Sequence, residues 1–87
     1  MNKYEVIFED YKGKKHSIGF AKDVGESFKL ENCFAIQRDY LKEKRPKFKS
    51  YYIRVNGPDK NGNFMVDFGS YDEFFYFNLV NEKEEGN

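Results

Sequence analysis

The stretch LENCFAIQRDYL, residues 30–41, decides the fold, because its apolar residues recur with the period of an α-helix. Pro46 disfavours a helical Arg45, so we expect the helix to end near that residue. Upstream, Asp23 and Glu26 have the spacing of a capping box, which predicts a helix start close to Asp23. One face of the predicted helix carries Leu30, Cys33, Phe34, Ile36, Gln37, Tyr40 and Leu41.

Strand-like alternation flanks this helix on both sides. Before it, alternation from Tyr4 to Phe8 and from His16 to Phe20, around a turn at Gly13, predicts a β-hairpin. After it, residues from Tyr51 to Val55 and from Phe64 to Phe68 alternate in the same way. The loop between these two runs is rich in Asn, Asp, Gly and Pro, which are turn-forming residues. Four strands are therefore expected around the helix.

The last apolar run, residues 73–80, is apolar at both parities. It fits either a strand covered on both sides or a short helix capped by Ser70, and we favour the strand because Phe and Tyr suit a pleated surface. The element order is then β-β-α-β-β-β. We predict a single α+β domain over residues 1–80, with an antiparallel sheet and one amphipathic helix on one face, and a flexible acidic tail over residues 81–87.

The composition of the whole chain limits its function. Fifteen basic and fifteen acidic side chains among 87 residues give no net charge, so the positive excess of a dedicated nucleic-acid binder is missing. The single cysteine, Cys33, excludes an internal disulfide framework and favours a reducing compartment. No signal peptide and no apolar stretch of about 20 residues is visible. We expect a cytoplasmic protein without membrane contact.

Residues suited to catalysis are few. Cys33 and His16 form the only possible Cys-His pair, and Cys33 lies on the apolar helix face, where a buried thiol is the usual outcome. The chain has neither a P-loop nor a dinucleotide-binding glycine fingerprint. We therefore expect no enzymatic activity and no cofactor.

One loop partly matches a calcium-binding pattern. Asp59, Asn61 and Asn63 occupy the first three ligand positions of such a loop. Phe64 stands where the loop needs Gly, however, and Ser70 stands where it needs a bidentate Glu. Because Asp, Asn and Gly also build ordinary turns, we expect a plain loop and no metal site.

The 10 Phe and 7 Tyr residues are more rings than one small core can be expected to bury. The strand residues that can face the helix are Tyr4, Val6, Phe8, Ile18, Phe20, Ile53, Val55, Phe64, Val66 and Phe68. Those expected on the other sheet face are Ile7, Tyr52, Met65, Phe75 and Phe77. A single helix cannot cover both faces, so that second face is covered by residues 71–80, by a second copy or by a partner.

Charge patterning points to protein recognition. Residues 42–49 contain five basic side chains against Glu43 alone, whereas the C-terminal part is acidic. Separated charge patches around exposed rings suit a protein interface, where charge steers encounter and rings act as hot spots. The alternative is that both segments are ordinary solvated surface. The candidate protein-binding residues are Tyr52, Tyr71, Asp72, Glu73, Phe75 and Phe77.

In being short, neutral, rich in Tyr, Phe, Lys and Asn and without a catalytic motif, the chain is similar to small accessory proteins of phages and mobile elements of AT-rich bacteria. That likeness implies a non-enzymatic module that binds and modulates a larger protein, for instance by inhibiting a host or defence enzyme. One alternative is single-stranded nucleic-acid binding by a basic and aromatic sheet edge. Its candidate residues are Lys44, Arg45, Lys47, Lys49, Tyr52 and Arg54. A second alternative is a structural homodimer.

Overall fold

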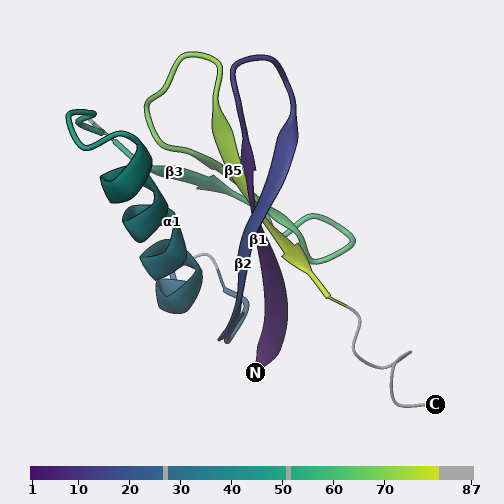
Figure 1. Ribbon diagram of the computed structural model, residues 1–87. Helices are drawn as coiled ribbons and strands as arrows, with labels where there is room; N and C mark the ends of the chain where they lie inside the picture. The colour runs from purple at the N-terminus through teal and green to yellow at the C-terminus, as the bar shows by residue number, and fades with distance from the viewer. Residues whose placement is uncertain (27, 51, 81–87) are drawn as a thin grey trace.

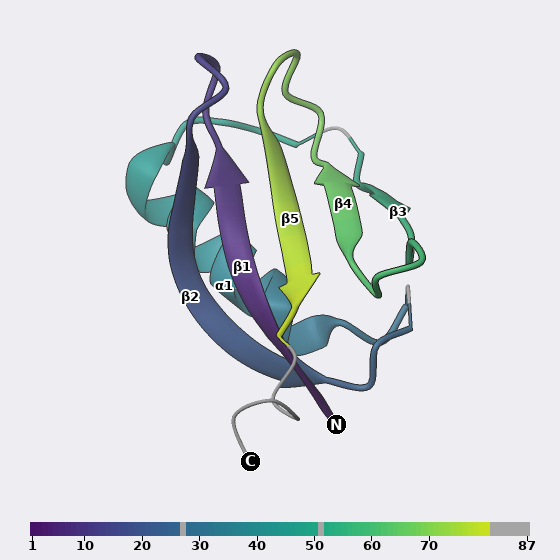
Figure 2. The same ribbon diagram turned by 90° about the vertical axis from the view of Figure 1, so that its right-hand side faces the viewer.

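A computed structural model describes residues 1–26, 28–50 and 52–80 and confirms the predicted order β-β-α-β-β-β. Five antiparallel strands form one sheet in the order β2-β1-β5-β4-β3 (Figure 2), and the helix lies against one face (Figure 1). The elements are β1 (Asn2–Glu9), β2 (Lys15–Asp23), α1 (Glu31–Lys44), β3 (Arg54–Asn56), β4 (Phe64–Asp67) and β5 (Phe74–Leu79). The predicted acidic tail, residues 81–87, lies outside the described residues. In the described part of the chain, no helix has the length and apolarity needed to cross a membrane.

The core lies between α1 and the sheet and is built mainly from the inward side chains of the strands. Rings dominate it: Phe75 packs against Phe8 and Phe68 with centroids 5.1 and 5.0 Å apart, and Phe34 meets Phe77 edge to face at 5.1 Å. Such rings each bury on the order of 150–250 Å², so they supply most of the apolar burial available to a small domain. The buried apolar residues are Tyr4, Val6, Phe8, Leu30, Cys33, Phe64, Val66, Phe68, Phe75 and Phe77.

Phe75 and Phe77 face the helix, so the prediction that they lie on the opposite sheet face is wrong. Both are fully buried. Phe75 pairs with Phe8 of β1, and Phe77 pairs with Val6 of β1, and these two partners are buried as well. Directly paired residues of antiparallel strands share a face, so the pairing settles the parity of β5. Periodicity alone could not, because the run is apolar at both parities.

Phe20 is also misplaced by simple alternation, which predicted that it faces the helix. The β1–β2 register shifts between Val6 and Ile7: Ile7 pairs with Ser17, whereas Val6 pairs with Gly19. Such a bulge inserts one residue and reverses the parity of everything beyond it. Phe20 therefore pairs with Glu5 on the outer face and is 54% exposed.

The helix begins at Glu31, eight residues beyond the predicted cap at Asp23. Asp23 is instead the last residue of β2, and it caps the helix across the intervening loop. Its carboxylate accepts hydrogen bonds from the backbone N–H groups of Asn32 at 3.1 Å and Cys33 at 2.8 Å. The predicted capping box of Asp23 and Glu26 is therefore wrong, because Asp23 reaches the first turn of the helix through a tertiary contact that local spacing does not describe. The helix ends at Lys44, as Pro46 indicated.

The strand after the helix is shorter than predicted. It covers Arg54–Asn56, and Tyr51 lies outside the described residues. Ile53 precedes the first paired residue and is 53% exposed, so it does not pack into the core as the alternation predicted. The last apolar run forms a strand, β5, as predicted. Because β5 pairs with β1 on one side and with β4 on the other, it joins the two halves of the sheet.

Candidate functional site

Within the described residues, α1 covers one side of the sheet and no element lies over the other side, which we call the open face (Figure 2). Strand register aligns a row across it: Ile7 pairs with Tyr76, Tyr76 with Met65, and Met65 with Asn56. Polar and charged side chains surround this partly apolar row. The residues of the open face are Lys3, Glu5, Ile7, Glu9, Lys15, Ser17, Phe20, Lys22, Arg54, Asn56, Met65, Asp67, Phe74, Tyr76 and Asn78.

Three rings of the open face and its β3 edge each carry a basic side chain over the ring. The geometry is that of cation–π pairs, which favour a cation within about 6 Å of the centroid. Charge and aromatic surface are therefore combined at each of these positions. The pairs are Lys3 over Phe20 at 5.1 Å, Lys15 over Tyr76 at 4.7 Å and Arg54 over Tyr52 at 5.7 Å.

Tyr76 is the best-fixed ring of the open face. Its hydroxyl donates a hydrogen bond of 2.7 Å to Oε1 of Glu9 on β1. Partial burial, and then the hydrogen bond and charge of Glu9, raise the pKa of Tyr76 to about 12. The phenol is therefore neutral at physiological pH, and its ring presents a fixed surface between β1 and β4.

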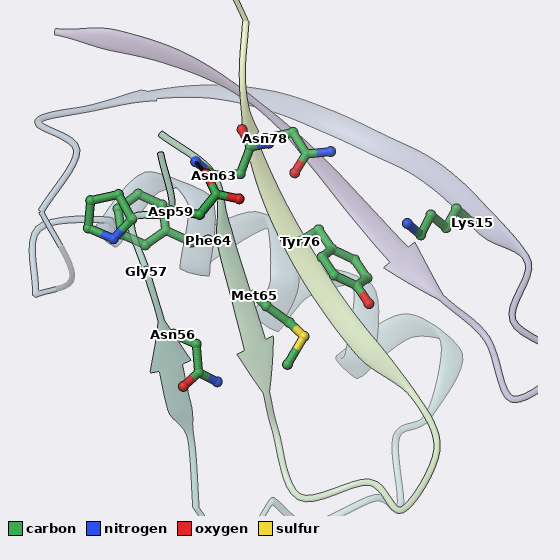
Figure 3. Close-up of a pocket in the computed structure, with 10 residues that line it drawn as sticks. Lys15, Asn56, Gly57, Asp59, Asn63, Phe64, Met65, Tyr76 and Asn78 are labelled. Carbon is green, nitrogen blue, oxygen red and sulfur yellow. Dashed lines mark hydrogen bonds between the residues drawn. The ribbon is translucent and has the colours of Figure 1, made fainter. Parts of the chain in front are cut away.

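Beside Tyr76 the open face is hollowed into a groove of about 650 Å³ (Figure 3). The 57–63 loop forms one rim, and Lys15 stands at the far end beyond the Tyr76 ring. Asp59 organises the rim: its Oδ1 accepts hydrogen bonds from the backbone N–H groups of Asn61 at 2.8 Å and Asn63 at 2.9 Å. These contacts lower the pKa of Asp59. The lining residues are Lys15, Asn56, Gly57, Pro58, Asp59, Asn63, Phe64, Met65, Tyr76 and Asn78.

Among the predicted protein-binding residues, Tyr71 and Asp72 are exposed in the β4–β5 loop, Tyr71 at 99%. Glu73 is not available, because it is buried and forms a two-pronged ion pair with Arg45 while accepting a hydrogen bond from Ser70 at 2.9 Å. The Arg45 contact first, and Ser70 second, lower the pKa of Glu73 despite its burial. Phe75 and Phe77 belong to the core. Only Tyr52, Tyr71 and Asp72 of that set remain accessible.

The ion pair also changes the predicted charge pattern. Arg45 belongs to the basic segment and Glu73 to the acidic one, so the two segments touch and partly neutralise each other. The predicted nucleic-acid residues are divided by the sheet. The Tyr52 hydroxyl donates a hydrogen bond of 3.3 Å to Oδ2 of Asp67, and Arg54 is the strand-register partner of Asp67, so both lie on the open-face side. Arg45 lies on the helix side. Lys44 is the last residue of the helix, and Lys47 and Lys49 follow it; all three are exposed. Nζ of Lys44 lies 3.7 Å from Oε1 of Glu43.

The two residues of the possible catalytic pair lie at opposite ends of β2. His16 contacts Asp10 at 2.9 Å near the strand's start, whereas the backbone of Cys33 is bonded to Asp23 at its end. Burial, and then Asp23, raise the pKa of the Cys33 thiol well above its ordinary value, which disfavours a reactive thiolate. Across residues 1–26, 28–50 and 52–80, no cluster of three His, Cys, Asp or Glu side chains is placed to hold a metal ion.

No family model, curated protein or solved structure matches this chain. The open-face residues that sequence reasoning missed are Phe20, Phe74, Tyr76, Asn56 and Asn78. One signal was available: Gly19 interrupts a strand pattern, and such a glycine often marks a bulge. The parity of Phe74 and Tyr76 had no comparable local signal.

Proposed function

We propose that this chain is a non-enzymatic protein-interaction module that binds a larger protein through its open face. The observation that carries the proposal is a whole sheet face left uncovered by the described elements, with a partly apolar central row and rings at its margins. Aromatic anchors surrounded by a polar rim are the anatomy of a protein interface. Modulation or inhibition of a host or defence enzyme, by an accessory protein of a phage or mobile element, is the form of this function that we favour.

Mixed charge supports a protein as the partner. Four basic residues of the open face, Lys3, Lys15, Lys22 and Arg54, are interspersed with Glu5, Glu9 and Asp67. Such a pattern suits a partner that carries both signs of charge, since complementary charges select the partner and like charges reject others.

The test is a pull-down from a nuclease-treated bacterial lysate, read by mass spectrometry, with matched variants. Phe20→Ser combined with Met65→Ser removes apolar surface from the open face. Phe28→Ser is the control, because Phe28 is 80% exposed and lies outside that face. We expect one protein captured in stoichiometric amount by the wild type and by the control, and lost with the double variant. Equal capture by all three folded proteins would contradict the proposal.

A second candidate function, single-stranded nucleic-acid binding, is favoured by the three ring–cation pairs, because stacked bases and phosphates need those groups. The carboxylates of the same face oppose it. An affinity for oligo-dT that falls steeply with salt would support this candidate, and the absence of such binding would remove it. Light scattering over a dilution series tests the homodimer alternative.

A further inference from the structure

The groove of the open face has an apolar floor. Met65 and Tyr76 are directly paired across β4 and β5, so their side chains lie next to each other (Figure 3). Both are half-buried, and the Tyr76 ring is held in place by Glu9. A groove of about 650 Å³ is large enough to hold a few residues of an extended chain. The floor can therefore take one apolar side chain of a bound segment.

Amide side chains stand along the same groove. Asn63 is fixed in the structure, since its Oδ1 accepts a hydrogen bond of 2.8 Å from the backbone N–H of Leu79. Asn56 and Asn78 differ: neither side-chain amide has a hydrogen-bond partner among the described residues. An Asn side chain offers both a donor and an acceptor, which are the groups that a peptide bond also offers. Two free amides beside an apolar floor are thus suited to the main chain of an extended peptide.

The charges at the two ends of the groove differ. Lys15 supplies a cation at one end, 4.7 Å from the Tyr76 centroid. The 57–63 loop supplies the Asp59 carboxylate at the other end, where it is tied to the loop backbone. An acidic side chain would be attracted at the Lys15 end and repelled at the Asp59 end. The groove is therefore complementary to a segment with its acidic residue near Lys15.

We propose that the groove binds an extended segment of a protein partner, with an apolar side chain on Met65 and Tyr76 and an acidic side chain at Lys15. Asn56 and Asn78 bond the main chain of the segment between these two points. This inference rests on the proposed function and states the chemistry of the partner. A nucleic-acid strand is less favoured, because its phosphates recur along the strand and would meet Asp59 at one end of the groove as well as Lys15 at the other.

The experiment selects a random 12-residue peptide library, displayed on phage, on the immobilised full-length protein. The strongest peptide is then measured by fluorescence anisotropy against wild type and variants. Asn78→Leu removes the amide at nearly constant size, and Asn61→Leu makes the same change at an exposed position of the rim loop that does not line the groove. Lys15→Met and Lys47→Met form a second matched pair, because Lys47 is exposed and follows the helix, away from the groove.

We expect enriched peptides that combine an apolar with an acidic residue. Asn78→Leu should weaken binding about tenfold, which corresponds to one hydrogen bond of about 1.4 kcal/mol. Asn61→Leu and Lys47→Met should leave the affinity unchanged. Lys15→Met should weaken binding of the acidic peptide. The same variant should not change the affinity for a version of the peptide with Gln in place of the acidic residue.

Three results would overturn the inference: no enrichment, equal affinity for Asn78→Leu and wild type, or displacement of the peptide by a dT15 oligonucleotide. The lysate capture separates this failure from failure of the proposed function. If Asn78→Leu and Lys15→Met bind the captured partner with wild-type affinity, while the Phe20→Ser, Met65→Ser variant loses it, the open face binds a protein but the groove does not hold a peptide segment.

Discussion

The two faces of this sheet use similar residues for different ends, and β5 shows the difference within four positions. Phe75 and Phe77 are fully buried beneath α1, whereas Phe74 and Tyr76, which alternate with them, are half-buried on the open face. The inner rings pack against other rings, and the outer Tyr76 contacts a lysine and a glutamate. Aromatic content by itself therefore does not identify a binding surface; the strand pairing that sets the parity does.

The largest expected effect contrasts the two faces directly. Phe75→Ala should destabilise the fold by about 3–5 kcal/mol, because it empties a fully buried site between Phe8 and Phe68. Phe74→Ala, one residue away, should cost about 1 kcal/mol, since less apolar surface is lost there. Urea unfolding monitored by circular dichroism measures both. Similar costs for the two variants would contradict the assigned parity.

A second variant tests the attachment of the helix to the inner face. Asp23→Ala should cost about 2 kcal/mol, because it removes a buried acceptor from the N–H groups of Asn32 and Cys33. Hydrogen exchange should accelerate first in the initial turn of α1. Unchanged protection at these two amides would show that the cap contributes little.

The ion pair behind the β4–β5 loop gives a pH-dependent effect of intermediate size. The pKa of Glu73 is lowered in the folded protein from its ordinary 4.5, so the folded state binds fewer protons than the unfolded state in the acid range. This stabilisation is complete above the ordinary pKa and is lost as the pH falls through the folded value. Glu73→Gln should cost about 1 kcal/mol at neutral pH, discounted because Arg45 is 41% exposed.

The measurement is the stability of both proteins between pH 3 and pH 7, a range that spans the ordinary pKa on both sides. The difference between wild type and Glu73→Gln should shrink as the pH falls. The pKa of Asp10 is also lowered, by His16 and by backbone N–H groups. Because Asp10 is the same in both proteins, its contribution to the pH dependence of stability cancels in the difference. A difference that stays constant with pH would argue against the ion pair.

The smallest expected effect lies on the open face. Tyr76→Phe removes the bond to Glu9 and should cost about 0.5–1 kcal/mol. Absorbance at a wavelength specific to tyrosinate should differ between wild type and variant only near pH 12, where Tyr76 ionises. A difference that already appears near pH 10 would mean that the phenol is neither desolvated nor bonded to Glu9.

The candidate site was only partly predictable from sequence. Tyr52, Tyr71 and Asp72 were named and are accessible, but Phe75, Phe77 and Glu73 were named and are buried. A charged residue is usually solvated, and Glu73 departs from this because Arg45, 28 positions away, neutralises it. Such a contact has no local sequence signature.

By itself the sequence determined the element order, the helix face and the end of α1, because these depend on periodicity and on Pro46, which act over a few residues. Tertiary structure alone decided which rings are buried. The bulge near Gly19 turned Phe20 outward, and pairing with β1 turned Phe75 and Phe77 inward. Both outcomes follow from one physical fact: strand side chains alternate, so a one-residue difference in register exchanges the two faces of a sheet.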